Sequence, residues 1–239
     1  LARATLSMRI TLSALGLSSA LVLSFAAPSY AQSSDLAFDE IIVTATKRDE
    51  NIQDVPLSVT ALPQDVLDTF GGGGDDIQYL SARVPSLVIE SSFGRIFPRS
   101  YIRGLGNTDF DLNASQPVSF IYDDIVYENP VLKGFPVFDT QQVEVLRGPQ
   151  GSLFGRNTPA GIIKFDSVKP SQQTDAYVKA SYGSFDTVQV QGAVGGGLTE
   201  SLSVRASGLF QRRDDYIENQ FLGDVGDAGG FEEYAYRVQ

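Results

Sequence analysis

The stretch VEVLRGPQGSLFGRNTPAGIIKF, residues 143–165, decides the fold. Its two ends, residues 143–146 and 162–165, are short apolar runs of the kind that form β-strands. Between them, glycine and proline supply backbone turns where a Cβ would clash or where a fixed φ is required. These turn residues are Gly148, Pro149, Gly151, Gly155 and Gly161. The stretch therefore predicts two strands joined by a turn-rich connection, and its glycines are structural.

Further short runs lie on the N-terminal side of this stretch. The predicted strands cover residues 55–62, 87–90, 101–103, 118–122, 143–146 and 162–165. Pro63 opens a short helix that ends at Gly71, where a four-glycine loop begins. Asp75 or Asp76 caps a second helix with apolar residues at helical spacing. Two short helices and six short strands predict a small domain of mixed α and β structure.

Composition excludes several classes of chemistry. The 239 residues contain no Cys and no His, which excludes a His–Cys zinc site, a Ser-His-Asp triad, a thiol nucleophile and a disulfide framework. Asp123 and Asp124 end a strand without a partner nucleophile, so we interpret them as a solvated turn and predict no catalytic residue, cofactor or metal. Acidic residues outnumber basic ones 29 to 18, and no basic cluster is present, so no nucleic-acid partner is expected.

The N-terminus has the layout of a secretory signal peptide at residues 1–31. Arg9 precedes an apolar run at residues 10–27, and small residues precede the predicted cleavage before Gln32. A membrane anchor is the alternative. It is disfavoured because the run is near the lower length limit for a spanning helix and contains Ser, Thr and Gly.

A β-branched run, DEIIVTAT at residues 39–46, stands between charged and flexible flanks. It has no neighbouring apolar sequence to pack against. One interpretation is an edge strand of the domain that follows. The other is a docking peptide that adds a strand to the exposed sheet edge of another protein. The sequence pattern alone does not choose between them.

The second half of the chain shows strict alternation of apolar and polar residues. Runs at residues 176–182, 188–194 and 202–211 predict strands of an antiparallel meander, with a turn at the glycine triplet 195–197. An acidic, glycine-rich segment at 223–233 predicts a long loop. A soluble sandwich buries the apolar face of such strands, whereas a membrane barrel turns it to lipid, so periodicity alone does not distinguish these folds.

Three stretches occur in an order that is typical of one family: YIRGLG at 101–106, VSFIYDDIVY at 118–127, and the stretch at 143–165. Together they resemble the plug domain of TonB-dependent outer-membrane receptors. The resemblance covers about residues 39–239, and the third stretch is its most specific part. Residues 162–165 depart from the family pattern, which usually has a second Gly and an Asn there, and this departure puts only local turn geometry in question.

The resemblance implies an α+β plug domain, a small mixed sheet with short helices, followed by the first antiparallel strands of a transmembrane β-barrel, truncated. The implied division is a signal peptide (1–31), a periplasmic lead (32–51) with the TonB box (39–46), the plug (52–170) and barrel strands (171–239). The family barrel has about twenty-two strands. Three strands cannot close a barrel, so we expect this sequence to be the N-terminal part of a longer receptor.

As a family member, the protein is expected to sit in the cell outer membrane and to transport a ferric siderophore or similar iron chelate actively, without enzymatic activity. TonB, outer-membrane lipid and the metal chelate are the implied partners. The implied TonB-binding residues are Asp39, Glu40, Ile41, Ile42, Val43, Thr44 and Ala45. A secreted β-rich binding module without transport activity is the alternative.

Two further sets of residues are candidates for binding roles. Arg103 and Arg147 each lie at a strand end before Gly, where a guanidinium can pair with carboxylates, and the resemblance implies that they tie plug to barrel wall. Direct ligand contact is their alternative role. The candidate ligand-binding residues are Phe93, Arg95, Phe97 and Arg99. Their rings and charges suit a catecholate through cation–π contacts, and they suit equally a role in holding a loop together.

Overall fold

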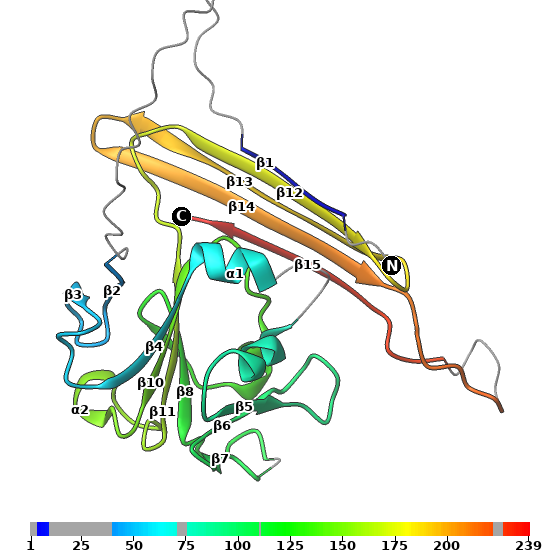
Figure 1. Cartoon of the computed structure of the whole chain (residues 1–239), viewed down its shortest axis with the longest axis horizontal. Helices are drawn as coiled ribbons and strands as arrows, with labels where there is room; N and C mark the ends of the chain where they lie inside the picture. The colour runs from blue at the N-terminus through cyan, green and yellow to red at the C-terminus, as the bar shows by residue number, and fades with distance from the viewer. Residues whose placement is uncertain (1–3, 10–39, 71–75, 110, 222–226) are drawn as a thin grey trace, which may run out of the picture.

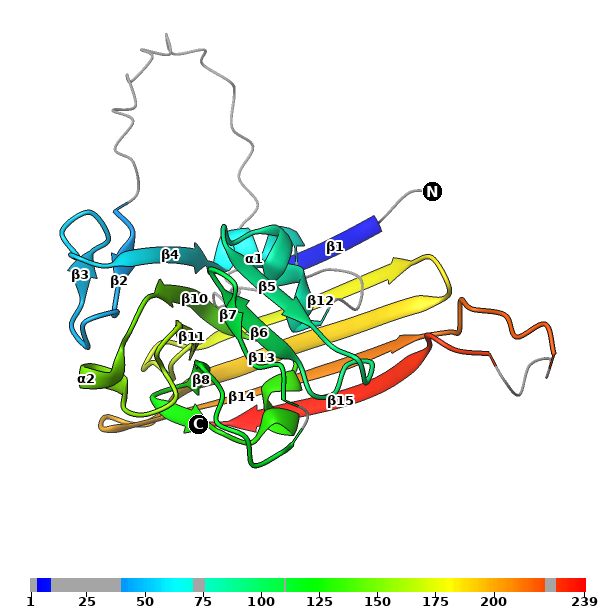
Figure 2. The ribbon, with the colours of Figure 1, turned by 90° about the horizontal axis from the view of Figure 1, so that it is seen from below.

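The computed structural model describes residues 4–9, 40–70, 76–109, 111–221 and 227–239. Within them, a small N-terminal domain (residues 40–167) lies against a long twisted sheet that crosses one side of it (Figure 1). Figure 2 shows that the long strands extend well beyond the domain at the end opposite β2 and β3. No helix in these residues is both long enough and apolar enough to cross a membrane.

The described part of the N-terminal domain consists of short elements. They are β2 (Ile42–Val43), β3 (Glu50–Asn51), β4 (Ser58–Pro63), α1 (Gln64–Phe70), the 3₁₀ helix η1 (Ile77–Ala82), β5 (Leu87–Glu90), β6 (Arg99–Ile102), β7 (Leu105–Gly106), β8 (Val118–Tyr122), β9 (Ile125–Tyr127), the 3₁₀ helix η2 (Pro130–Gly134), β10 (Thr140–Arg147), α2 (Gly151–Phe154) and β11 (Gly161–Ser167). The long sheet adds β1 (Ala4–Arg9), β12 (Asp175–Gly183), β13 (Thr187–Thr199), β14 (Leu202–Arg213) and β15 (Phe231–Val238).

A five-stranded mixed sheet organises the N-terminal domain, in the order β4-β10-β11-β8-β9. β8 and β11 are parallel, and the other neighbouring strands are antiparallel. One face packs under α1, η1 and β5, with Phe120 and Phe165 almost fully buried and Tyr122 stacked on Phe165 at a centroid distance of 4.3 Å. The other face carries Ile121, Leu146 and Ile162, which pack against the segment that contains β2.

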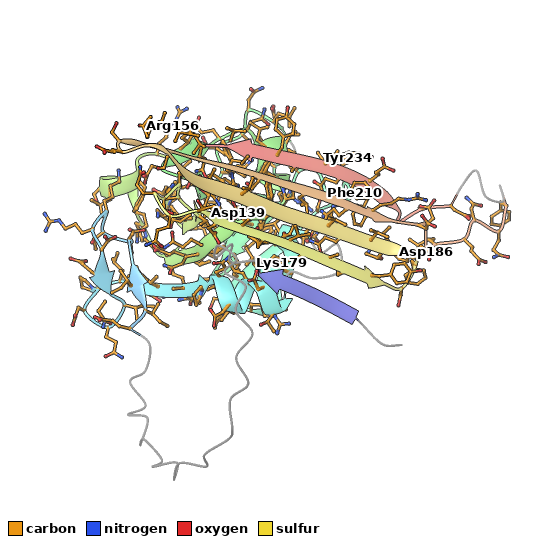
Figure 3. The ribbon with its side chains drawn as sticks, turned by 90° about the horizontal axis from the view of Figure 1, so that it is seen from above. Asp139, Arg156, Lys179, Asp186, Phe210 and Tyr234 are labelled. Carbon is orange, nitrogen blue, oxygen red and sulfur yellow. The ribbon has the colours of Figure 1, made fainter. Side chains whose placement is uncertain are left out.

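The long sheet has the order β1-β12-β13-β14-β15, and its polar face lies against the N-terminal domain. Gln189, Arg205 and Gln211 point to that side and are buried. The apolar residues of the same strands point away and are exposed: Val178, Tyr182, Val190, Val194, Tyr234, Tyr236 and Val238. Figure 3 labels Phe210 and Tyr234 on this outer face, where their ring centroids are 5.0 Å apart. A soluble sandwich would have the opposite arrangement, because it buries the apolar face.

Most predicted elements are present. The strands at 87–90 and 118–122 have the predicted bounds, and the antiparallel meander is confirmed. The second predicted helix is present as η1, and the Asp76 side chain caps it by accepting from the Gln78 amide at 2.8 Å. The turn predicted at residues 195–197 is wrong: these glycines lie inside β13, where they pair with β14.

Some differences concern the chain ends and loops. β15 begins at Phe231, so the loop predicted at 223–233 ends earlier than expected. Asp123 and Asp124 form the predicted turn between β8 and β9, with φ of 46° and 69°. β1 precedes the predicted cleavage site and pairs antiparallel with β12. The four-glycine run, the apolar core of the predicted signal peptide and Asp39 lie outside the described residues.

Gly161 provides a test of the central strand pair. Its φ is +147°, and a Cβ at this position would lie 2.2 Å from the Leu146 carbonyl oxygen on the neighbouring strand. We predict that Gly161→Ala lowers the free energy of unfolding by about 3 kcal/mol, because the backbone must shift to relieve the overlap. Urea unfolding of the chain in detergent, followed by far-UV circular dichroism, measures this change.

Gly151→Ala is the matched control. Its added Cβ would meet only Thr158 Oγ1, at 3.8 Å, and the position is helical. This variant should be neutral or stabilised by up to about 1 kcal/mol. Equal destabilisation by the two variants would show that Gly161 is not required for close contact between β10 and β11.

Candidate functional site

Residues 42–46, here called the docked segment, pack on the open face of the mixed sheet. β2 pairs with β3 in a small two-stranded hairpin that does not join the five-stranded sheet. The side chains of Val43 and Ala45 are fully buried, and they contact the apolar cluster that includes Leu146 and Phe154. The described part of the predicted run, residues 40–46, is therefore not an edge strand of the mixed sheet, although part of it pairs locally.

Polar groups on β10 hold the backbone of this segment. Glu144 Oε1 accepts a hydrogen bond from the Thr44 amide at 2.7 Å and from the Thr44 hydroxyl at 3.1 Å. Gln142 Nε2 donates to Glu144 Oε1 at 2.8 Å and to the Ile42 carbonyl at 3.1 Å. Glu144 is completely buried, and this burial raises the pKa of its carboxyl group. A fully buried acid, flanked by Val143 and Val145 on β10, is thus used to bind the docked segment.

Lys164 adds a second charge beneath the docked segment. It lies directly opposite Glu144 in the β10–β11 register and is 3% exposed. Its Nζ donates to the Thr44 hydroxyl oxygen at 2.6 Å and forms an ion pair with Asp166 on the same strand. The Thr44 hydroxyl therefore accepts from Lys164 and donates to Glu144, so one residue of the segment links both buried charges.

A cleft of about 850 Å³ lies at the other end of the N-terminal domain, where β14 and β15 meet the loop between β5 and β6. We call it the arginine cleft. Arg95 lies over the Phe231 ring at 4.0 Å, and Arg213 lies over the same ring at 5.0 Å. Arg95 also forms an ion pair with Glu233 at 3.1 Å. The cleft thus combines cationic and aromatic groups from the domain and from the long sheet.

The four candidate ligand residues separate into two pairs. Phe93 and Arg95 line the arginine cleft, and Phe93 is 59% exposed. Phe97 is buried and makes an edge-to-face contact with Phe93 at 6.0 Å. Arg99 donates to Ser92 and pairs with Glu90, both within the same loop region. Phe97 and Arg99 therefore contact residues of their own loop region, whereas Phe93 and Arg95 line the arginine cleft. Ligand contact by these four residues stays a prediction.

An ion pair anchors the N-terminal domain to the long sheet. Arg205 on β14 donates from Nε and Nη2 to the two carboxylate oxygens of Asp139, at 2.8 and 2.6 Å. Both side chains are almost completely buried, at 4% and 0% exposure. Tyr177 donates to the same carboxylate, and Arg237 donates to the carbonyls of Phe138 and Asp139. Figure 3 shows Asp139 in the part of the domain that the long strands cross.

The two arginines predicted to pair with a barrel wall have other positions in the described structure. Arg147 donates to Ser58 Oγ, to Thr60 Oγ1 and to the Pro85 carbonyl, all within the N-terminal domain. Arg103 lies at the exposed turn between β6 and β7, with φ of 54°. Neither residue contacts β12–β15 among the described contacts, so their predicted pairing with the barrel wall stays a prediction. The anchor that is present uses an acid on the domain and an arginine on the sheet.

Known proteins share this fold. The model of the TonB-dependent receptor plug domain matches residues 51–162. Residues 51–162 are the plug domain of a TonB-dependent receptor. The crystal structure of the ferric yersiniabactin uptake receptor FyuA from Yersinia pestis superposes with a TM-score of 0.66 at 25% identity, covering 76% of this chain and 28% of that one. The resemblance inferred from sequence is confirmed, as is the fold class of a plug domain followed by antiparallel barrel strands.

The curated relatives are named as receptors or transporters. The pesticin receptor of Yersinia pestis is 28% identical over 188 residues, which are 77% of this chain and 27% of the relative. The vitamin B12 transporter BtuB of Vibrio vulnificus is 28% identical over 99 residues, which are 41% of this chain and 16% of the relative. The chain thus spans about a quarter or less of the length of these relatives.

Sequence reasoning missed the residues that join the plug to the docked segment and to the long sheet. Glu144 and Lys164 are each the single charged residue within a short apolar run, VEV and IIKF. A charged residue inside a run that is expected to be buried is the signal that would have identified them. Asp139 and Arg205 are 66 positions apart, and no local pattern relates them. In the described residues, no cluster of acidic side chains is suited to hold a metal ion.

The anchor gives a prediction on stability. Arg205→Ala should lower the free energy of unfolding by about 3–5 kcal/mol, because it leaves the buried Asp139 carboxylate without its ion-pair partner. Asp139→Ala should cost less than Arg205→Ala but still more than about 1 kcal/mol, because Arg205 keeps its second ion pair, with Asp175 at 3.1 Å. The double variant should cost less than the sum of the two. Urea unfolding of the chain in detergent measures all three.

Arg212→Ala is the control on the same strand. Its ion pair with Asp214 has side chains that are 54% and 44% exposed, and exposed pairs contribute about 0–1 kcal/mol. The anchor role of Asp139 is contradicted when Asp139→Ala costs no more than Arg212→Ala.

Proposed function

We propose that this chain is the N-terminal part of a receptor that imports a scarce ligand actively across the outer membrane. The observation that carries this proposal is that β2, in the docked segment, and the β5–β6 loop lie at opposite ends of one plug (Figures 1 and 2). That loop lines the arginine cleft, and the docked segment packs on the mixed sheet. A ligand bound on one side of a membrane can then influence a segment presented on the other. The names of the relatives, a receptor and a transporter, support the same function.

The outer face of the long sheet supports a membrane location. Its exposed residues are apolar and aromatic, with Tyr236 and Val238 at 85% and 75% exposure. A contiguous apolar face of this kind is suited to lipid and is a poor surface for a soluble protein. This argues against a secreted binding module, whose apolar face would be packed inward. Outer-membrane lipid is therefore a proposed partner, reached after export by the proposed signal peptide at residues 1–31.

The proposed ligand is a ferric siderophore or similar iron chelate. The matched relatives include receptors named for ferric yersiniabactin and ferric pyoverdine. Guanidinium groups stacked on an aromatic ring suit an anionic chelate with aromatic donors, because charge attraction and stacking act together. The likeness to a vitamin B12 transporter makes a cobalamin the ligand to test beside the iron chelates. No covalent step is part of the proposed function.

TonB is the proposed partner of residues 39–45, within a periplasmic lead at 32–51. Ile41 and Ile42 are 38% and 42% exposed beside a groove of about 810 Å³, so a partner strand can approach them. In this proposal the plug covers 52–170, and barrel strands follow from 171. Ligand binding transmits a signal only if the ligand binds more tightly to the state in which the segment is free.

Ile42→Pro tests the role of the segment. Proline removes the amide that a partner strand would need, so we predict that uptake of an iron-55 siderophore complex by cells producing the receptor is abolished. Binding of the same complex at 4 °C should be unchanged. Ile42→Val, which keeps both the amide and the β-branch, should take up the complex as the wild type does. Wild-type uptake by Ile42→Pro contradicts the TonB-box assignment.

Phe93→Ala tests the arginine cleft. Because Phe93 is exposed and lines the cleft, its loss should weaken binding of the siderophore complex about tenfold with little effect on stability. Leu112→Ala, an equally exposed apolar residue outside the cleft, should bind as the wild type does. Equal affinities for all three proteins would show that ligand binds elsewhere.

A further inference from the structure

The buried polar groups beneath the docked segment have a role that the proposed function does not assign. We propose that Lys164 and Glu144 form a polar latch that sets how often residues 42–46 leave the plug. In this role both are positioning residues, which act through Thr44. The inference rests on the proposed function, in which release of this segment makes it available to TonB.

The geometry makes Thr44 the link between the two charges. Its hydroxyl accepts from Lys164 at 2.6 Å and donates to Glu144 at 3.1 Å, and its amide donates to the same Glu144 oxygen at 2.7 Å. Hydrogen bonds to charged groups are the stronger ones in proteins. Three of them converge on a single residue, so the segment has one position in which all are made.

The charges beneath the segment are also costly to bury, and this makes the latch reversible. Glu144 is 0% exposed, and among the described residues its Oε2 accepts no hydrogen bond. Lys164 is 3% exposed. When the segment leaves, water reaches both side chains and restores their hydration. This gain offsets part of the lost hydrogen bonds and of the lost burial of Val43 and Ala45. Docked and free states then lie close enough in free energy for a ligand to shift their populations.

Lys164 contributes to docking from outside the docked segment. It stands in the stretch IIKF at residues 162–165, on the strand facing Glu144. An uncharged side chain there would leave Thr44 with Glu144 alone, and Asp166 without its ion-pair partner. The strength of docking therefore depends on a residue outside the segment that TonB is proposed to bind.

The absence of Cys from the chain allows a direct test by thiol labelling. Val43→Cys places a thiol at a fully buried position of the docked segment, so its reaction with a maleimide reports undocking. In this background and without ligand, we expect Lys164→Met and Thr44→Val to label about tenfold faster or more. Thr44→Ser keeps the hydroxyl and should label at the rate of the Val43→Cys protein.

Lys169→Met is the control for loss of a lysine on the same face. Lys169 pairs with Asp123 and is 56% exposed, so its removal should not change the labelling rate. Circular dichroism of each variant verifies that the plug and sheet are folded, and Thr44→Val provides an independent test should Lys164→Met not fold. Unchanged labelling in both Lys164→Met and Thr44→Val overturns the latch.

A second readout separates the latch from the proposed function. A purified periplasmic fragment of TonB should bind the ligand-free Lys164→Met receptor more tightly than the wild type, by a factor similar to the gain in labelling. Faster labelling without tighter TonB binding upholds the latch and contradicts the assignment of residues 39–45 to TonB.

Discussion

The bidentate ion pair between Asp139 and Arg205 fixes where the plug meets the long sheet. Asp139 immediately precedes β10, so the pair also sets the position of that strand. β10 then carries Glu144, which binds the docked segment, and ends at Arg147, which binds the Pro85 carbonyl just before β5. One strand therefore contacts the sheet, the docked segment and the support of the loop that lines the arginine cleft. A shift of β10 would therefore change the contacts with the long sheet, with the docked segment and with the residues before β5.

The second constraint is the orientation of the long sheet. Its buried polar face is joined to the plug by the ion pairs of Arg205 with Asp139 and of Lys179 with Asp68, and by hydrogen bonds from Arg237, whereas its apolar face packs against nothing in the described chain. Specific polar contacts rather than a shared apolar core thus join the two bodies, apart from a small cluster around Phe138. Polar interfaces of this kind constrain the relative motion of the two parts less than a large apolar interface would.

Sequence reasoning identified the strands and the family, because turn residues and alternation are local signals. It could not decide which face of the alternating strands is buried, since both solutions have the same period of two. It could not place residues 39–46 either, because the surface that receives them is made of β10 and β11, a hundred positions later. Arg103 and Arg147 were predicted as pairing residues from their positions at strand ends. The pair of Asp139 and Arg205 was not predicted, because the two residues are 66 positions apart and meet only in the folded chain.

The most direct test of the account is competition for TonB by a peptide of residues 39–46. The periplasmic fragment of TonB is bound to the purified receptor, and the peptide DEIIVTAT or a scrambled version is added. The account predicts that the native peptide displaces the receptor and that the scrambled peptide does not. Binding of TonB that neither peptide reduces would place the contact elsewhere and would contradict the proposed role of the segment docked on β10 as the TonB box.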